Sequence, residues 1–347
     1  MNKRLAIAIA AIAVLGAAAF LTLKPSPPTQ VEESEHGIEP QKYEAINGIY
    51  VEEIVSTLRP LAVMVENHPD ARPQSGLSEA DIVYETLAEG GITRFLVLFQ
   101  SRAANEIGSV RSARDYFAEI ANEWGALYAH VGGSNEVIAN LKKGIYENLD
   151  DANEYYNGDF FPRKKEKSAP HEIFTSTQNL RNLIAEHNFS DIANYLSWQF
   201  KDDSPTTASG TPDIYIDFSR AGYEVTWEYD PVQNNYKRSI YFEADYDAVS
   251  KEQIRAKNVV IQMVDVTPVP KDPFLRVDID LNGGSDASAG VKNKAIIFQD
   301  GKSTVGFWKR ENNRTRFFDA NSQEIKFNRG PIWLELVPED KEVNLKW

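Results

Sequence analysis

Apolar runs alternate with amphipathic stretches through the first half of the chain, a pattern typical of α/β proteins. Leu61–Val65 is a continuous apolar run, as expected for a strand that is buried on both faces. In residues 113–124 the apolar positions recur at helical spacing and mark one helix face. This alternation predicts an α/β (α+β) N-terminal domain with a mixed sheet and flanking helices. Further strands are predicted at Ile82–Tyr84, Arg94–Phe99 and Leu127–Val131, and further helices over residues 137–142 and 180–187.

The pattern changes after residues 200–213, a polar segment without apolar periodicity. Beyond it, short apolar runs alternate with turn signals such as Asp230-Pro231 and Asp300-Gly301. This predicts a mainly β C-terminal domain over residues 214–347, joined by the linker 200–213 to the α/β domain of residues 58–199. Because the linker is polar, cleavage between Ser204 and Pro212 is expected to leave two fragments that each fold. The strands of the second domain are predicted at residues 214–218, 223–229, 236–241, 259–264, 276–281, 295–299, 305–309 and 333–337.

An apolar run at the N-terminus predicts a membrane segment. Leu5–Leu23 contains no charged residue and follows Lys3 and Arg4. As a helix it would span roughly 28 Å, close to the hydrocarbon thickness of a bilayer, and the basic residues favour a cytoplasmic start. It is either a cleaved signal peptide, with small residues at Ala17–Ala19, or an uncleaved anchor, which its length favours. We therefore expect a signal peptide or single-pass anchor in the cell membrane (1–24), membrane contact through residues 5–23, an extracytoplasmic linker (25–57) and an extracytoplasmic body.

Composition excludes several classes of function. The chain has 51 acidic and 37 basic residues and a net charge of −14, which disfavours nonspecific binding of nucleic acid. It has no Cys, which excludes disulfides, thiolate zinc sites, a Cys nucleophile and lipid attachment at a Cys. Zinc-protease, P-loop, serine-hydrolase and dinucleotide motifs are absent from the sequence. Asp and Glu could bind a metal, but no spacing singles out a set, so metal and cofactor are not specified.

Two arginines follow a predicted strand and suggest an anion-binding pocket. Ser112 is a plausible N-cap for the helix over residues 113–124, and Asp115 completes a capping-box-like pattern. Arg111 and Arg114 then crowd the positive end of the helix dipole, where a bound anion would offset the repulsion. The alternative is that acidic residues neutralise these arginines in structural ion pairs, namely Asp115, Glu85 or Glu89.

A second junction between strand and helix holds Gly132, Gly133 and Ser134. The glycines let backbone N–H groups approach a ligand closely, and Ser134 can cap the helix or donate. If the strands before the two junctions are parallel neighbours, their carboxyl ends lie at one edge of the sheet, and this junction lies beside Arg111. Ligand sites in such sheets collect at that edge. His130 stands at the same end, either as a functional residue or as a hydrogen-bonded structural one.

Other polar residues could reach the same edge of the sheet. Glu66 and His68 follow the first strand and could act in general acid–base catalysis, or they form a polar loop. His171 follows the basic run Arg163–Lys165, which is either a phosphate-facing loop or a solvated surface. The candidate catalytic residues are Glu66, His68 and His130, and the candidate ligand-binding residues are Arg72, Arg94, Arg111, Ser112, Arg114, Gly132, Gly133, Ser134 and His171.

At these residues the chain resembles the YerB-like family of bacterial envelope lipoproteins, which have an N-terminal domain of unknown function and a smaller C-terminal companion. The resemblance implies an extracytoplasmic bacterial protein and supplies no established reaction. The family's lipid-bearing Cys is missing here, so a transmembrane helix is expected in its place. The similar segments are Arg59–His68, Arg72–Leu77, Ala80–Glu85, Glu89–Phe95, Gly108–Arg114, His130–Ser134, Ala169–His171, Tyr229–Pro231, Tyr236–Arg238 and Ala256–Val259.

A shorter similarity, at Ala80-Asp81 and Ser109–Ser112, is to the LytR-CpsA-Psr phosphotransferases, which bind polyprenyl pyrophosphate through arginines and attach glycopolymers to the wall. The leading hypothesis is a membrane-anchored envelope protein whose N-terminal domain binds an anionic (phosphate or carboxylate) ligand, such as an envelope polymer or a lipid-linked precursor. The alternatives are a non-enzymatic partner-binding module and a phosphotransferase. The residues leave open whether the protein is an enzyme.

Overall fold

The computed structural model describes residues 42–347, except residue 193 and the segments 207–211 and 283–292. The expected anchor (1–24) and residues 25–41 of the expected linker lie outside this part of the chain. Within residues 42–57 the structure has two short paired strands, β1 (Tyr43–Glu44) and β2 (Tyr50–Val51), and helix α2 (Glu53–Thr57). In the part of the chain that the structure describes, no helix is long and apolar enough to cross a membrane.

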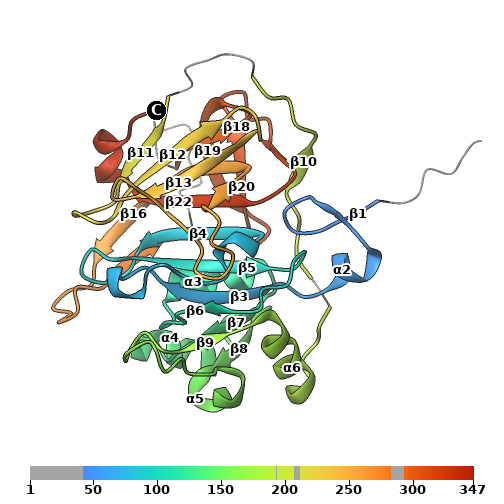
Figure 1. The fold of residues 1–347 in the computed structure, drawn as a ribbon, viewed down its shortest axis with the longest axis vertical. Helices are drawn as coiled ribbons and strands as arrows, with labels where there is room; N and C mark the ends of the chain where they lie inside the picture. The colour runs from blue at the N-terminus through green and yellow to red at the C-terminus, as the bar shows by residue number, and fades with distance from the viewer. Residues whose placement is uncertain (1–41, 193, 207–211, 283–292) are drawn as a thin grey trace, which may run out of the picture. The chain divides into compact units, whose positions relative to one another are not determined.

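Eleven strands of the described residues form one mixed sheet, the largest sheet of the fold. Its path runs β20-β19-β18-β16-β22-β4-β5-β3-β7-β8, and β17 pairs with β16 off this path. Figure 1 shows the orange and red strands of the second half continuing the sheet begun by the blue and green strands of the first. The strands are β3 (Leu61–Glu66), β4 (Ile82–Leu87), β5 (Thr93–Phe99), β7 (Leu127–His130), β8 (Asp150–Asn153), β16 (Asn258–Pro268), β17 (Val277–Asp280), β18 (Lys294–Gln299), β19 (Lys302–Glu311), β20 (Arg314–Asp319) and β22 (Ile332–Pro338).

Strand β22 joins the two halves of the chain. It pairs in parallel with β16 on one side, where Val259 faces Trp333, and with β4 on the other, where Ile82 faces Ile332. The predicted linker also takes part, since β10 (Gln199–Lys201) pairs in parallel with β21 (Lys326–Asn328). Residues 42–347 form one compact unit. The expectation that the two halves fold as separate fragments is therefore not consistent with the structure, because they share a sheet and a core.

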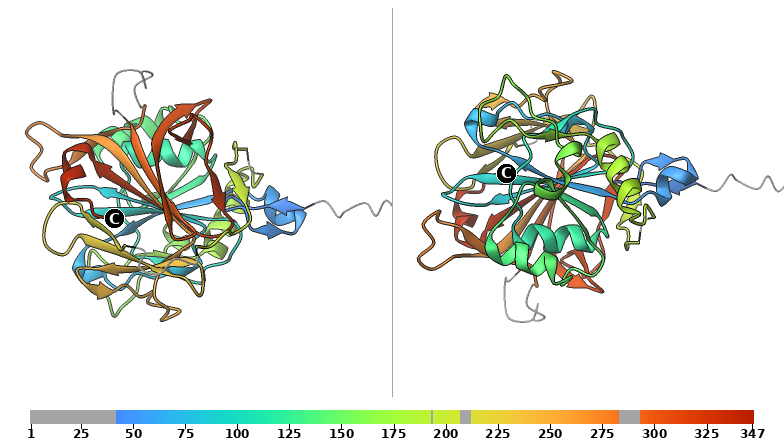
Figure 2. Two further views of the ribbon diagram at one scale, coloured as in Figure 1. Left: turned by 90° about the horizontal axis from the view of Figure 1, so that it is seen from above. Right: turned by 90° about the horizontal axis from the view of Figure 1, so that it is seen from below.

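The central strands are buried on both faces, as the continuous apolar runs predict. In β3, Val63 and Val65 point into one core cluster and Ala62 and Met64 into the other, because successive side chains of a strand alternate between faces. The first cluster includes apolar residues of helix α6 (Thr177–His187) and of a smaller second sheet. The second includes the apolar face of α3 (Asp115–Glu123) and two residues of α4 (Asn135–Lys142). Figure 2 shows α3 and the yellow second sheet on opposite sides of the central sheet.

The second sheet is built entirely from the C-terminal half. Its strands alternate buried and partly exposed residues, which is typical of a sheet with one wet face. The predicted fold class, an α/β N-terminal region with a mixed sheet followed by a mainly β region, is confirmed. The strands are β11 (Ile214–Asp217), β12 (Glu224–Asp230), β13 (Asn235–Ile240), β14 (Glu243–Ala244) and β15 (Arg255–Ala256); the short elements β6 (Ile107–Gly108), α5 (Glu154–Asn157) and β9 (Phe174–Thr175) belong to the first half.

Candidate functional site

An extended segment, residues 109–113, lies between the carboxyl ends of the parallel strands β3 and β7. Arg111 N–H donates to Met64 O of β3 (2.9 Å), and Val131 N–H donates to Arg111 O (3.0 Å). One step further on, Ala113 N–H donates to Gly132 O at 2.9 Å, and Ala113 and Gly133 form an isolated parallel bridge. The Arg111 and Gly133 junctions are thus side by side, as expected for parallel neighbouring strands.

Helix α3 begins later than the sequence predicts. Its N-cap is Arg114, and no side chain makes a capping hydrogen bond. Ser112 is therefore not the cap, and its carbonyl instead accepts from Arg94 Nη1 (2.9 Å). Asp115 forms no capping box, because its carboxylate accepts from Asn140 and Tyr146 of the α4 region. Helix α4 behaves as predicted, since Ser134 Oγ accepts from Val137 N–H at 3.2 Å.

Glu89 binds two of the predicted arginines at once. One carboxylate oxygen pairs with Arg94 Nη2 and the other with Arg114 Nη2. Burial on its own would raise the pKa of Glu89, but the charges of Arg94 and Arg114 outweigh it and lower that pKa. For these two arginines the structural ion pair with Glu89 is the arrangement observed. Glu85 pairs elsewhere, with Arg238.

Next to this triad lies a pocket of about 410 Å³. Arg114 is buried in its wall, and its Nε has no hydrogen-bond partner among the described residues. Burial, and next the charge of Arg94, lower the pKa of Arg114. Arg276 enters from the C-terminal half and is held by Asp272. The lining residues are Glu89, Arg111, Ser112, Arg114, Gly133, Ser134, Asn135, Phe274 and Arg276.

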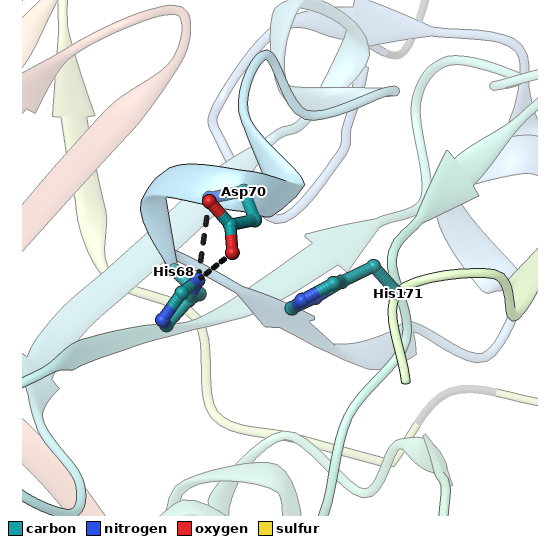
Figure 3. Close-up of side chains that lie close together, drawn as sticks. All are labelled: His68, Asp70 and His171. Carbon is teal, nitrogen blue, oxygen red and sulfur yellow. Dashed lines mark hydrogen bonds and ion pairs between the residues drawn. The ribbon is translucent and has the colours of Figure 1, made fainter. Parts of the chain in front are cut away.

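Beside the pocket, Glu66 joins Arg111 to His171. Its Oε2 lies 2.7 Å from His171 Nδ1, and its Oε1 lies 3.1 Å from Arg111 Nε, although that N–H is not directed for a hydrogen bond. His171 stacks on His68, with ring centroids 5.4 Å apart and planes inclined by 24°. Figure 3 shows the two imidazoles on facing loops with Asp70 above His68. Four candidates, Glu66, His68, Arg111 and His171, therefore meet at this edge, and of these only Arg111 lines the pocket.

Three further candidates, His130, Gly132 and Arg72, also lie outside the pocket and have structural partners. The ring of His130 is fully buried, with Nδ1 2.7 Å from Gly132 O and Nε2 2.7 Å from Asp151 Oδ1. The ring of His130 therefore holds the turn at Gly132 and does not line the pocket. Gly132 has φ +56° and supports that turn, and its N–H donates to Asn153 Oδ1. Arg72 donates to Asn67 and to Gly222 O, so it ties the two halves together.

The two segments that resemble the phosphotransferases do not share a site. Asp81 precedes β4 and accepts hydrogen bonds from the backbone of Gln100 and Ser101. That end of the sheet is where β3 begins, whereas Arg111 lies beside Glu66, where β3 ends. A six-residue strand separates them, which is roughly 17 Å at about 3.3 Å per residue.

Comparisons with known proteins agree with the two-part sequence pattern. Residues 47–190 match the family described as "Protein of unknown function (DUF3048) N-terminal domain", and residues 214–334 match its C-terminal domain. A candidate lipoprotein of Bacillus subtilis (strain 168), YerB, is 31% identical over 296 residues, which are 85% of this chain and 86% of YerB. The chain belongs to the DUF3048 family. The crystal structure of YerB from Bacillus subtilis has a TM-score of 0.75 and 31% identity, covering 86% of this chain and 97% of that one.

The pocket combines both DUF3048 domains. Residues 89–135 of its lining fall in the N-terminal domain, and Phe274 and Arg276 fall in the C-terminal domain. At this pocket the two domains meet through their backbones: Glu89 and Arg276 form an isolated antiparallel bridge, and Gly90 N–H donates to Leu275 O (3.1 Å). Sequence reasoning missed Arg276 and Phe274, because no local pattern indicates that this loop returns to β4.

Proposed function

We propose that this protein acts in the bacterial envelope, held at the membrane, and that the pocket at Arg111 and Arg114 binds the anionic group of an envelope ligand. The envelope assignment is supported by the apolar run Leu5–Leu23 and by the relative YerB, which is named as a candidate lipoprotein. The single observation that carries the ligand proposal is the convergence of Arg111, Arg114 and Arg276 on one pocket with one acidic lining residue, Glu89.

The balance of charge around the pocket favours an anion. Four guanidinium groups meet three carboxylates there, in a chain whose net charge is −14. Acidic residues do line an adjoining cavity, but it is only about 40 Å³. Arg114 and Arg276 line both spaces, so the excess of guanidinium groups over carboxylates describes the larger pocket alone; a charge-assisted hydrogen bond from Arg114, whose side chain is largely buried, is stronger than one in bulk solvent. The guanidinium groups are those of Arg94, Arg111, Arg114 and Arg276, and the carboxylates are Glu66, Glu89 and Asp272.

Donors for an anion remain in the pocket lining. The side chain of Ser112 makes no hydrogen bond within the described residues; Arg114 Nε–H also lacks a partner there, but this atom is buried and reaches a ligand only if the guanidinium group moves. Ser134 Oγ accepts from the α4 backbone, which leaves its O–H able to donate. A phosphate or carboxylate accepts such hydrogen bonds, and the pocket volume lies within the range of about 300–1,000 Å³ for small-molecule sites.

One feature favours a ligand with an apolar part. Phe274 lines the pocket and is 70% exposed, and its neighbour Leu275 is equally exposed. Large apolar side chains beside a cationic pocket suit an amphiphile, with its anionic group among the arginines and its chain over Phe274. A lipid-linked envelope precursor has this chemistry. The same exposed pair also suits a protein partner, which is the alternative, non-enzymatic function.

Binding of inorganic pyrophosphate and of an undecaprenyl-phosphate analogue to the purified full chain in detergent tests the proposal. Arg111→Ala should weaken binding about tenfold to a hundredfold, the loss expected for one charge-assisted hydrogen bond of about 1.5–3 kcal/mol. The matched control is Arg316→Ala, because Arg316 also pairs with a glutamate and is similarly exposed but lies on β20. Failure of both probes to bind the parent protein, or an equal effect of the two substitutions, would refute the anion pocket.

A further inference from the structure

His171 lies beside His68 and Asp70, although about a hundred residues separate it from them in sequence. One potential ligand atom from each lies within 4.8 Å of the others. His68 and Asp70 belong to the turn after β3, which includes the 3₁₀ segment Pro69–Ala71, and His171 belongs to the loop before β9. Figure 3 shows the imidazole of His171 directed toward His68 and Asp70. We propose that these three side chains bind a divalent transition-metal ion.

The hydrogen bond between His171 and Glu66 prepares His171 as a ligand. An ionised carboxylate only accepts hydrogen bonds, so His171 Nδ1, 2.7 Å from Glu66 Oε2, carries the proton. The lone pair is then on Nε2, the other ring nitrogen. A histidine that binds a metal usually donates its second N–H to a carboxylate or carbonyl in this way, which fixes the tautomer and the ring orientation.

His171 is also held by its backbone. Ser109 Oγ–H donates to His171 O at 2.5 Å, and His171 N–H donates to Ser168 O at 2.8 Å. Glu66 in turn lies against Arg111. The ring is therefore positioned before any ion binds, so little conformational entropy is lost on binding.

His68 and Asp70 supply the exposed side of the site. His68 Nδ1 accepts from Asp70 N–H at 3.2 Å and lies 3.7 Å from Asp70 Oδ2. If His68 binds the ion through Nε2, its Nδ1 keeps the hydrogen bond from Asp70 N–H; if it binds through Nδ1, that hydrogen bond is lost. Two imidazoles on one ion have ligating nitrogens about 3.3 Å apart, for bonds of about 2.0–2.1 Å in tetrahedral geometry. The potential ligand atoms lie within 4.8 Å of one another, so the two nitrogens must approach by at most about 1.5 Å, and the stacked rings must tilt toward the ion, to reach this spacing.

The donor set selects the class of ion. Imidazole nitrogen with one carboxylate suits Zn²⁺ and the neighbouring first-row ions, whereas Mg²⁺ and Ca²⁺ prefer oxygen ligands. The side chain of His171 is 11% exposed, that of His68 34% and that of Asp70 75%, so water can complete the coordination from the Asp70 side. Stacking of the two imidazoles alone would not explain the contact of His171 with Glu66, whereas Asp70 is placed by the 3₁₀ turn that His68 caps. The inference does not depend on the anion pocket.

Metal binding by the full chain, purified in detergent without a histidine tag and stripped with a chelator, tests the site. Titration with Zn²⁺ should show one bound ion per chain, and Co²⁺ should give visible d–d absorption bands of a nitrogen-ligated ion. His68→Ala should weaken Zn²⁺ binding at least about tenfold, and Glu66→Gln roughly 10–100-fold, the effect typical of a residue that orients a ligand. Mg²⁺ and Ca²⁺ should not compete.

The chain has five histidines, so two others serve as controls. His187→Ala removes a histidine on α6 that stacks on Phe189, and His36→Ala removes one near the N-terminus; neither should change binding. Thermal unfolding of apo His68→Ala close to that of the parent would show that the loss of binding is local. Absence of Zn²⁺ binding by the parent, equal binding by His68→Ala, or equal competition by Mg²⁺ would each overturn the inference.

Discussion

Glu85 of β4 and Glu335 of β22 face each other in parallel register, and both are fully buried. Arg238 Nη2 donates to Glu85 Oε2 at 2.6 Å, and Trp227 Nε1 donates to Glu335 Oε1 at 2.8 Å. Burial, and next the charge of Glu85, raise the pKa of Glu335 well above its usual range. Glu335 is therefore the neutral member, and this acid pair joins the two halves of the chain at the centre of the sheet.

Replacing Glu335 by Gln should change stability little near pH 4, where Glu335 is neutral in the folded and unfolded states alike, because the amide is neutral, similar in shape and able to accept from Trp227. At pH 7 the same replacement should raise stability. Glu85→Gln should instead cost on the order of 3 kcal/mol, since it removes a charged partner from the buried Arg238. Chemical denaturation of the two variants measures the difference. Equal losses would mean that Glu335, like Glu85, is ionised in the folded protein.

The raised pKa of Glu335 also predicts a dependence on pH. The folded protein keeps the Glu335 proton above the unfolded pKa of about 4.3, so the folded state binds one proton more than the unfolded state. The contribution of Glu335 to the free energy of unfolding is then fully present below that pH. It falls as pH rises, by at most about 1.4 kcal/mol per pH unit. Glu335→Gln lacks this loss, so its stability relative to the parent should increase between pH 5 and pH 8. A constant difference would contradict the assignment of the proton.

The sequence predicts β4 and β22 as strands, but not that they are neighbours. Both are apolar runs of the type expected for a strand buried on both faces, and such runs show that a strand is central without identifying its partners. About 250 residues separate the paired positions. A polar linker between an α/β pattern and a mainly β pattern predicts two independent domains. In the structure, β22 of the second half instead pairs with β4 of the first half.

Separation of the halves should accordingly prevent folding. Residues 42–204 made alone would leave the β4 edge unpaired and expose the core residues that β22 covers. We expect this fragment to show no cooperative thermal unfolding. A chain nicked between Ser204 and Pro212 should instead remain associated during gel filtration and unfold in one transition. Cooperative unfolding of the isolated N-terminal fragment would show that the first half has a sufficient core of its own.

Asp300 holds the predicted linker to the β18–β19 turn. Its carboxylate accepts from Lys201 Nζ (2.6 Å), Asn328 Nδ2 (2.7 Å) and Ser204 N–H (3.0 Å). Burial on its own would raise the pKa of Asp300, but the hydrogen bonds from Lys201, Asn234 and Asn328 outweigh it and lower the pKa to about 2. The Asp-Gly signal thus predicts the turn correctly, with φ of +58° and +69°, but not this second role.

Asp300→Asn should lower stability at pH 7 by about 1–3 kcal/mol, because charge-assisted hydrogen bonds are lost while Asn tolerates the positive φ. A lowered pKa contributes stability that is present above the unfolded pKa near 3.8 and is lost as pH falls toward 2. The parent and Asp300→Asn should therefore converge between about pH 4 and pH 2. Asp202→Asn is the control, since that side chain is 93% exposed, and it should match the parent throughout. A difference that persists at pH 2 would assign the effect to packing.

The proximity of candidate residues could be predicted only where the strands and helices that hold them are close in sequence. The Arg111 and Gly133 junctions follow strands that are close in sequence and parallel, so their proximity could be inferred. The contact of Glu66 with His171 spans 105 residues and leaves no spacing pattern. The sequence left two roles open for His130, because a histidine at a strand end looks the same in sequence whether its ring faces a ligand or, as here, a carbonyl and Asp151.

Glu89 is the residue that best separates an anion pocket from a purely structural ion cluster. It is the single acidic residue among those that line the pocket, and it neutralises Arg94 and Arg114. Glu89→Gln should lower stability on the order of 3 kcal/mol, because it leaves two buried cations without their shared partner. Its pKa is lowered in the folded protein, so this loss should shrink as pH falls below about 4.

The same substitution should strengthen anion binding if the pocket has the proposed function. Two unit charges about 6 Å apart interact by a few kcal/mol at an effective dielectric constant of ~20, and partial exposure to solvent reduces this, so pyrophosphate affinity should rise about tenfold. Glu324→Gln removes a comparably exposed glutamate from an arginine pair on another face and should leave the affinity unchanged. Titration calorimetry at a temperature well below unfolding measures both. Loss of stability with no gain in affinity would mean that these arginines serve the fold alone, because a carboxylate competes with a ligand only where the ligand can take its place.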